Sequence, residues 1–324
     1  MQTALVTAIG SFSADVVIRR LHELGLRVIG CDIYARELVV DAMNVDAFYQ
    51  APYATKPDEY GAFVEEVCRN EGVNLILPLT DVEVDFFRGA APDRRFADAQ
   101  VLISDEHALS LCRDKAAMAK FLEHTKSGVR GIKTWLLSDC DTMPELPVVV
   151  KPLDGRSSQG LSRVYTASEW QAASSVPDPE RYIVQPLIEG RVVTVDIVRS
   201  QAGPAVACIP RRELLRTLNG AGTSVHVFRN DELMEACARL ADEVGIVGCA
   251  CFEFIETRGD HQYWFLECNP RFAGGVEFSC MVGYDCVGNH LRAFAGEPID
   301  PLGSFDNCYI ARKYEEFVTK VDHD

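Results

Sequence analysis

The first hundred residues alternate short apolar runs with amphipathic stretches. Three strands and two helices are expected there, the strands at 5–8, 27–32 and 75–79 and the helices at 14–24 and 63–70. Gly25 follows the first of these helices and is a typical helix-stop residue. Such alternation predicts a parallel sheet with right-handed crossovers. Ligands bind beyond the carboxyl ends of strands in such sheets, which places candidate contacts near Gly10, Asp32 and the loop 80–83.

A different pattern, with more strands, begins at residue 114. The elements expected there are helices at 114–124 and 231–244 and strands at 148–151, 182–188, 192–198, 249–256 and 262–269. Asn230 is the predicted N-cap of the second helix. The last two strands are joined by a turn that contains Gly259, which indicates a hairpin. The fold class expected is therefore α/β followed by α+β.

Composition and charge narrow the class of protein. The 324 residues are 48% hydrophobic and 25% charged, which is typical of a globular chain of two or three domains. With 48 acidic and 32 basic residues, the net charge of −16 argues against binding to nucleic acid or to an anionic membrane. No apolar stretch reaches the roughly 20 residues of a membrane span, and the amino terminus lacks the pattern of a signal peptide.

Twelve cysteines are scattered along the chain without a Cys-x-x-Cys pair. Most lie in apolar runs such as 248–252, where cysteine behaves as a small hydrophobic residue. Structural thiols are therefore favoured over zinc ligands or disulfides, and a reducing cytoplasm is the expected location.

The turn after the first strand raises the alternative of a nicotinamide-dependent oxidoreductase. It reads Gly10-Ser-Phe-Ser-Ala and has one glycine where the dinucleotide fingerprint has three. Asp32 lies where a ribose-binding acid would, although an aspartate often ends a second strand. A scaffold role for this region is favoured, and titration of NADH fluorescence separates the two interpretations.

A glycine-rich loop at 155–160 follows a strand that ends in Lys151. Glycines allow the backbone to approach a ligand, and free N–H groups can surround phosphate oxygens while Lys151 supplies a charge. No Gly-Lys-Ser/Thr follows, so this is not a Walker loop, and taken alone it is also compatible with an ordinary turn.

The hairpin carries a second group of polar residues. If it turns around Asp260, Glu253 lies opposite Glu267, and Asn269 shares their face. Two facing carboxylates among aromatic residues repel each other unless a cation or a proton intervenes. Oxygen ligands without histidine suit Mg²⁺, whereas the alternative is a solvated acidic pair.

Arg211 and Arg212 precede a glycine-rich stretch at 220–222. Paired arginines can hold an acyl or phosphoryl group, although solvated arginines would show the same pattern. There is no Gly-x-Ser-x-Gly or His-Glu-x-x-His motif, and the seven histidines do not cluster.

Together these motifs resemble those of the ATP-grasp superfamily, in the branch of the carbamoyl-phosphate synthase large subunit and related amino-acid ligases. The resemblance covers about residues 1–300 and rests on Asp114-Lys115, Val149-Val-Lys151-Pro, the 155–160 loop, Gln185-Pro-Leu-Ile-Glu-Gly190, Thr194-Val-Asp196 and Phe265-Leu-Glu267-Cys-Asn269-Pro-Arg271-Phe-Ala-Gly-Gly275. It implies a Rossmann-like pre-ATP-grasp domain at 1–105, a two-subdomain ATP-grasp fold at 106–300 and a short extension at 301–324. Within the second domain, it implies a smaller lid at about 114–188 and a larger catalytic subdomain at about 189–300.

The resemblance also implies a role for each matching residue. ATP would be bound by Lys115, Lys151, Gly155, Ser157, Ser158, Gly160, Gln185, Leu187, Ile188 and Glu189. Magnesium would be bound by Glu253, Glu267 and Asn269, with Mn²⁺ as an acceptable substitute. Arg271 and Arg211 would be catalytic, and the acceptor substrate would be met by Thr80, Asp81, Glu83 and Arg212. The family usually has a ribose-binding glutamate two residues after the hinge glycine, but here Val192 occupies that place, so nucleotide use is in question and Glu189 is the substitute.

The expected function is an ATP- and Mg²⁺-dependent ligase. A substrate carboxylate would become an acyl-phosphate, and an amine or a thiol would displace phosphate. An amino acid is the expected substrate, with its anionic end near Arg211 and its ammonium near Glu83. The partners expected are small-molecule carboxylates and amines, and a homodimer is a possible assembly. The rival interpretation is a catalytically idle, ATP-binding regulator.

Overall fold

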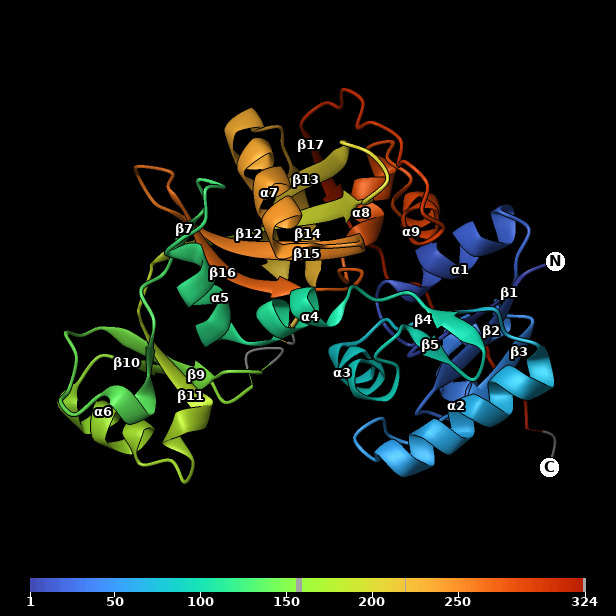
Figure 1. The fold of residues 1–324 in the computed structure, drawn as a ribbon, viewed down its shortest axis with the longest axis horizontal. Coiled ribbons are helices and arrows are strands. Elements are labelled where there is room, and N and C mark those ends of the chain that lie inside the picture. Colours follow the sequence, from blue (N-terminus) through green and yellow to red (C-terminus); the bar gives the residue numbers. More distant parts are fainter. Residues whose placement is uncertain (156–158, 219, 323–324) are drawn as a thin grey trace.

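The computed structural model describes residues 1–155, 159–218 and 220–322. Three sheets organise this part of the chain, one at the amino-terminal end, a small one in the middle of the sequence and a large one that follows (Figure 1). The expected combination of α/β and α+β architecture is confirmed.

The amino-terminal sheet has the strand order β3-β2-β1-β4-β6-β5. All its pairs are parallel except β5 with β6. Its elements are β1 (Thr3–Val6), α1 (Ala14–Glu23), β2 (Arg27–Asp32), η1 (Arg36–Leu38), η2 (Val40–Met43), β3 (Ala47–Gln50), α2 (Pro57–Glu71), β4 (Leu75–Leu77), α3 (Asp81–Ala90), β5 (Arg95–Phe96) and β6 (Ala99–Val101). Strand order reverses between β1 and β4, and ligands of doubly wound sheets bind at such a point.

The segment 80–83 is not a loop, as its sequence suggested, but the start of helix α3. Thr80 is the N-cap, and the Thr80 hydroxyl and backbone N–H both donate to the Glu83 carboxylate, at 2.7 and 3.2 Å. This is the capping box of a Thr-x-x-Glu sequence, which supplies partners to the free groups of a first helical turn.

The small sheet has the order β10-β9-β11-β8 and belongs to a separate body on one side of the molecule (Figure 1). Its elements are β8 (Trp135–Leu136), η3 (Leu137–Asp139), β9 (Val148–Pro152), β10 (Ser162–Val164), α6 (Ala167–Ser174), η4 (Pro179–Arg181) and β11 (Tyr182–Pro186). Val148, Val150 and Val184 belong to its own small hydrophobic core. Lys151 alternates with these valines and therefore lies on the opposite face of the sheet.

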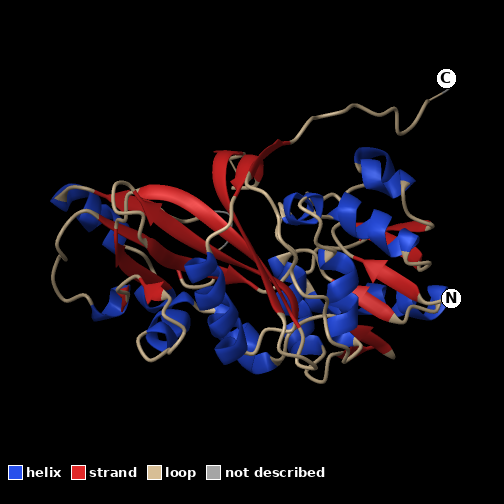
Figure 2. Cartoon of the chain, turned by 90° about the horizontal axis from the view of Figure 1, so that it is seen from above, coloured by secondary structure: helices blue, strands red, loops and turns tan. Residues whose placement is uncertain are grey.

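The large sheet has the order β17-β14-β13-β12-β15-β16-β7 and is strongly twisted (Figure 2). It is built with α4 (Glu106–Arg113), α5 (Lys115–Leu122), β7 (Arg130–Gly131), β12 (Gly190–Arg199), β13 (Val206–Arg216), β14 (Gly222–Val227), α7 (Asp231–Val244), β15 (Gly248–Thr257), β16 (Tyr263–Asn269), α8 (Val276–Met281), α9 (Cys286–Phe294) and β17 (Cys308–Ala311). Helix α7 begins at the predicted cap, because the Asn230 side chain accepts from the N–H of Leu233. Strand β17 lies within this sheet, while the division of the chain at residue 300 stays a prediction.

One hydrophobic cluster joins the amino-terminal sheet to the large sheet. It contains Val17 and Leu21 of α1 together with Val287 and Ala293 of α9. Arg20 adds a contact between the two parts, since it donates to Asp285 at 2.7 and 3.0 Å. The small sheet does not share this cluster, so these two larger parts form a common frame beside it.

All twelve cysteines are free thiols, and nine of them are buried. Within the described residues, no helix is long and apolar enough to cross a bilayer.

Candidate active site

A cavity of about 660 Å³ lies where the three sheets meet. It is lined by the carboxyl-edge loops of the amino-terminal sheet, by the end of β9 and by one face of the large sheet. The sequence-predicted residues that line it are Thr80, Asp81, Glu83, Lys115, Lys151, Gly155, Arg211, Glu253, Glu267, Asn269 and Arg271. The fold therefore brings together residues that are far apart in the chain, such as Asp81 and Arg271, which are separated by 190 positions.

The cavity face of the large sheet is a row of polar residues across four strands. Arg211 pairs with Thr194, Thr194 with Glu253, and Glu253 with Glu267. Directly opposed residues of paired strands share one face of the sheet, so all four side chains are on the same side. The predicted pairing of Glu253 with Glu267 is confirmed.

A bulge in β16 makes this arrangement possible. The register shifts by one residue after Glu253, so that Phe254 pairs with Phe265 and Leu266 is the additional residue. Phe265 can therefore pack in the core beneath α7 while Glu267, two positions later, faces the cavity. Without the bulge, the two-residue period would place both side chains on one face.

The facing carboxylates are held in an environment that favours a cation. Burial and, to a lesser degree, the charge of Glu267 raise the pKa of Glu253 to about 7. Arg216 Nη2 lies 3.5 Å from Glu253, and Lys115 Nζ lies 3.4 Å from Glu267. Two carboxylates and the nearby amide of Asn269 form the oxygen-rich donor set that suits Mg²⁺.

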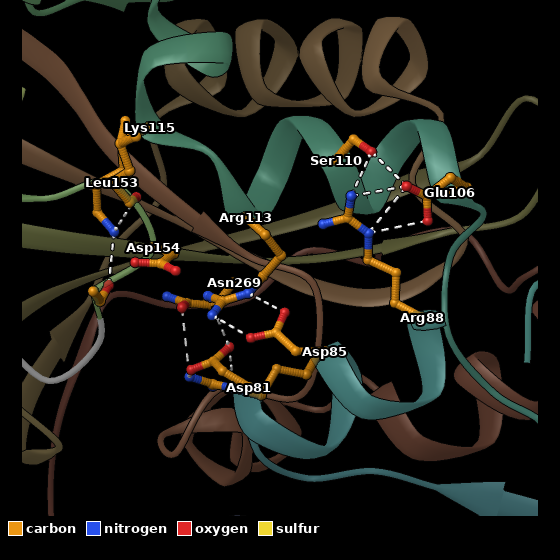
Figure 3. Close-up of polar contacts among 12 residues, drawn as sticks. Asp81, Asp85, Arg88, Glu106, Ser110, Arg113, Lys115, Leu153, Asp154 and Asn269 are labelled. Carbon is orange, nitrogen blue, oxygen red and sulfur yellow. Dashed lines mark hydrogen bonds and ion pairs between the residues drawn. The ribbon is translucent and has the colours of Figure 1, made fainter. Parts of the chain in front are cut away.

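Two lysines approach these carboxylates from the side of the small sheet. Lys115, the first residue of α5, donates to the carbonyl oxygens of Leu153 at 3.3 Å and Gly155 at 2.7 Å (Figure 3). Lys151 is buried against the cavity, and no hydrogen-bond partner for its ammonium is found among the described residues. Burial lowers the pKa of Lys151 to about 8, against the opposing influence of Glu267. An anionic ligand would supply the charge that this buried ammonium lacks.

This pKa predicts the pH dependence of nucleotide binding. Phosphate stabilises the protonated form of Lys151, so the affinity for MgADP should fall as the pH rises from 8 to 9.5, by up to roughly tenfold per pH unit. Glu253, with a pKa of about 7, is already ionised over this range and does not contribute to the trend. Calorimetric titration at three pH values measures it, and Lys151→Arg, which stays charged, should bind with little change over the same interval. Equal pH profiles for the wild type and Lys151→Arg would contradict the assignment.

Arg271 is held at the junction of the amino-terminal and large sheets. Its guanidinium donates to Asp81 at 3.0 and 2.7 Å in a bidentate pair. Arg113 of α4 lies 3.7 Å from Asp81 and forms its own bidentate pair with Asp85, both distances being 2.8 Å (Figure 3). The start of α3 therefore positions Arg271, which still lines the cavity.

The structure corrects the expectation that Arg211 and Arg212 act together. Consecutive residues of a strand point to opposite faces, and both lie in β13. Arg211 is buried on the cavity side and donates to Asp196 at 2.5 Å and to Glu213 at 3.0 Å. Arg212 lies on the other face, where it pairs with Glu256 at 2.7 and 2.8 Å, and is not among the residues that line the cavity.

The residues predicted to contact the acceptor substrate already have partners within the protein. The Glu83 carboxylate is buried and accepts from Tyr60 at 3.3 Å in addition to Thr80, and burial raises its pKa. Neither Glu83 nor Arg211 is therefore free of protein partners, although both line the cavity. The two-ended grip on an amino acid, with Arg211 at one end and Glu83 at the other, stays a prediction.

The predicted adenine contacts lie at the edge of the cavity. Gln185 is buried on the same face of the small sheet as Lys151, donates to the Thr134 hydroxyl at 2.9 Å and, with Leu266, lines a narrow pocket that adjoins the main one. The Leu187 N–H donates to the carbonyl of Pro147 at 3.0 Å, and Glu189 is exposed. Of the remaining predicted residues, Ile188 is half-buried, Gly160 has a positive φ of 69° beside Pro152, and Ser157 and Ser158 lie outside the described residues.

The sequence assigned no role to Thr194 and Glu213, which line the cavity, to Asp196, which accepts from Arg211, or to Arg216, which also lines the cavity. The first three were detectable as polar residues at alternate positions of apolar strands, a pattern that indicates one polar buried face. Arg216 was not detectable in this way. The pairing between Glu213 and Arg216 is irregular, and this changes the side of the sheet to which Arg216 points. The two-residue alternation of a regular strand would therefore place Arg216 on the wrong face.

Residues 178–314, which carry the polar row and the acidic hairpin, match the family described as ATP-grasp in the biosynthetic pathway with Ter operon. These residues therefore belong to an ATP-grasp domain. Curated relatives of the chain include the mitochondrial acetyl-CoA carboxylase of Saccharomyces cerevisiae, 24% identical over 175 residues, and acetyl-CoA carboxylase 2 of Oryza sativa, 28% identical over 136 residues. These alignments cover 50% and 39% of the chain but only 8% and 6% of the relatives, so the chain spans a small part of their length.

Solved structures share the ATP-grasp fold over nearly the whole chain. A biotin carboxylase of Campylobacter jejuni, solved as a beta-gamma-ATP complex, has a TM-score of 0.75 at 17% identity, with 92% of this chain and 72% of that chain covered. N5-carboxyaminoimidazole synthetase of Staphylococcus aureus has a TM-score of 0.70 at 14% identity, with 92% and 78% covered. The biotin carboxylase domain of a Hydrogenobacter thermophilus carboxylase, solved with MgADP, has a TM-score of 0.73 at 18% identity, with 94% and 71% covered. At these identities, the likeness establishes the fold alone.

Proposed function

We propose that this protein is an ATP- and Mg²⁺-dependent ligase that activates a carboxylate as an acyl-phosphate. One observation carries the proposal: the facing pair Glu253 and Glu267 lies in the same cavity as the buried Lys151 and as Arg271. Anion-binding cations beside cation-binding carboxylates form the environment that a metal-bound polyphosphate requires. The structural neighbours solved with beta-gamma-ATP or MgADP support the same assignment.

The residues present fit the metal. Glu253 and Glu267 would hold Mg²⁺ with the amide oxygen of Asn269. The cation would offset the burial of Glu253 and its repulsion by Glu267, which together raise the pKa of Glu253. When bound, Mg²⁺ would supply charge neutralisation for the transferred phosphoryl group. Lys115 and Lys151 would hold phosphate oxygens from the side of the small sheet, and Mn²⁺ is the expected substitute for Mg²⁺.

The proposed reaction has two steps. A substrate carboxylate attacks the γ-phosphorus of ATP, so that a C–O–P linkage forms and ADP leaves. A neutral amine then attacks the carbonyl carbon, the C–N bond forms, and phosphate leaves with the proton that the nitrogen loses. Arg271 faces this anionic chemistry, and Asp81 positions it. Arg211 would contribute through the part of its guanidinium that does not donate to Asp196 or Glu213. The reaction requires no protein nucleophile.

The carboxylate is proposed to come from an amino acid. Two arginines of the cavity, Arg216 and Arg271, provide positive charge at the wall where that carboxylate would lie. The cytoplasm is the proposed location, and small-molecule carboxylates and amines are the proposed partners.

A phosphate-release screen tests the function. Pairs of amino acids and amines are added to the protein with MgATP, and ADP, AMP and phosphate are quantified by chromatography. We expect ADP and phosphate in equal amounts, with turnover that depends on both organic substrates. AMP with pyrophosphate would contradict the acyl-phosphate route, and tight MgADP binding without turnover for any pair would instead support the ATP-binding regulator.

A further inference from the structure

The two halves of the cavity differ in charge and in side-chain chemistry. The walls formed by the small and large sheets carry the cations Lys115, Lys151, Arg211, Arg216 and Arg271. The wall formed by the amino-terminal sheet is lined by residues between Ala8 and Glu83, and its charged members are all carboxylates, namely Asp32, Asp81 and Glu83. Among the described residues, this wall contains no lysine or arginine, and only Asp81 is paired with arginines of neighbouring elements. The region around Asp32 and Glu83 is therefore a poor place for a second anion.

Aromatic residues are the second feature of this wall. Phe12 follows β1, Tyr34 follows β2 and Tyr53 follows β3, so three successive loops at the carboxyl edge each supply one ring. The three residues are 41%, 57% and 59% exposed, so their rings are accessible to a ligand in the cavity that they line. Aromatic faces combined with carboxylates form the environment that recognises an organic ammonium ion.

The backbone at this edge does not offer an unopposed anion site. Helix α1 begins at Ala14, but the Asp32 carboxylate already accepts the Gly10 N–H at 2.8 Å and the Tyr34 N–H at 3.1 Å. Asp15 adds a further negative charge in the first turn of α1. Of the cations in the described part of the chain, Arg312 has its guanidinium over one of these three rings, 5.3 Å from the centre of Phe12. Arg312 is not among the residues that line the cavity.

The aromatic wall is continuous with the proposed reaction centre. A Cβ placed on Gly274 would lie 3.6 Å from the Cβ of Phe12, so the first ring is adjacent to the loop that begins with Arg271. Asp81, which belongs to the same wall, accepts a hydrogen bond directly from Arg271. A molecule held between the rings would therefore present one end to the acyl-phosphate.

We infer that the amino-terminal half of the cavity binds the amine substrate, as an organic cation with an aromatic or apolar body and without a carboxylate or phosphate group. This inference rests on the proposed function, because that reaction requires an amine beside the activated carbonyl. The ammonium lies among the rings and carboxylates when it binds and releases one proton before the nitrogen attacks.

Three probes with the same body and different charge test the inference. Phenethylamine, 2-phenylethanol and 3-phenylpropanoate are titrated against the full chain, with MgADP present, and binding is measured by ligand-observed NMR. We expect the amine to bind most tightly and the carboxylate most weakly. Equal affinities for the three probes, or tightest binding of the carboxylate, would overturn the inference.

Substitutions at the aromatic residues test whether phenethylamine binds at this wall of the cavity. Tyr34→Ala and Tyr53→Ala should each weaken phenethylamine binding by roughly two- to thirtyfold and leave MgADP affinity unchanged. Tyr165→Ala, which removes a tyrosine of similar exposure (52%) that does not line the cavity, should change neither affinity. Unchanged amine affinity in both cavity variants would also overturn the inference. Failure of the proposed function would give a different result: the amine would bind as described, but no carboxylate would support ADP release.

Discussion

Replacement of Glu267 by glutamine should reduce MgATP turnover by roughly a hundredfold or more while the fold is kept. Glutamine has nearly the shape of glutamate, so the β16 bulge and the packing of Phe265 should persist. The change removes one of the two facing charges that would hold Mg²⁺ and the carboxylate that lies 3.4 Å from Lys115. The measurement is the rate of ADP release at saturating ATP over a Mg²⁺ series, together with the thermal unfolding temperature.

The matched control is Glu235→Gln, which makes the same change at an exposed side chain of α7. It should turn over ATP at the wild-type rate and unfold at the wild-type temperature. Activity of Glu267→Gln close to that of the control, with an unchanged Mg²⁺ dependence, would be incompatible with the metal assignment.

Replacement of Arg211 by alanine should lower the free energy of unfolding by about 3–5 kcal/mol, because it leaves two carboxylates buried without their cation. Asp196 and Glu213 both accept from this guanidinium, and each already has one buried oxygen without a hydrogen-bond partner among the described residues. Burial lowers the pKa of Arg211, but the two carboxylates outweigh this and raise it overall, so the charged form is present at any pH used. Urea denaturation of the wild type and the variant measures the difference.

Arg212→Ala is the control at the neighbouring position of the same strand. It should cost less, about 1–3 kcal/mol, because its partner Glu256 keeps contacts with His261 at 3.2 Å and Tyr263 at 3.3 Å. If Arg211→Ala were as stable as Arg212→Ala, the buried pair with Asp196 would not have the structural role inferred here. Any loss of activity in Arg211→Ala should therefore be interpreted only after the stability of the variant is known.

The secondary structure of the hairpin could be predicted from local sequence because the signals were local. The pairing of Glu253 with Glu267 follows from the position of one turn and the two-residue period of strands. The cap of α7 at Asn230 and the bounds of β2 likewise depend on neighbouring residues. Local reasoning was wrong at residues 80–83, where a capping box was taken for a loop. The residue types of a Thr-x-x-Glu cap were present, but the polar run was assigned to ligand binding.

What the sequence by itself determined was the family motif, the acidic hairpin and the parallel amino-terminal sheet, because each is encoded by residue types at short, regular spacing. Only the tertiary structure decided which polar groups are partners. The separation of Arg211 from Arg212, the bidentate contact of Arg271 with Asp81 and the gathering of Phe12, Tyr34 and Tyr53 on one wall depend on sheet register and on the packing of distant elements. The sequence alone does not say to which face of a strand a charged side chain points. Strand register, bulges and the packing of neighbouring sheets decide whether a counter-charge or an open cavity lies beside it.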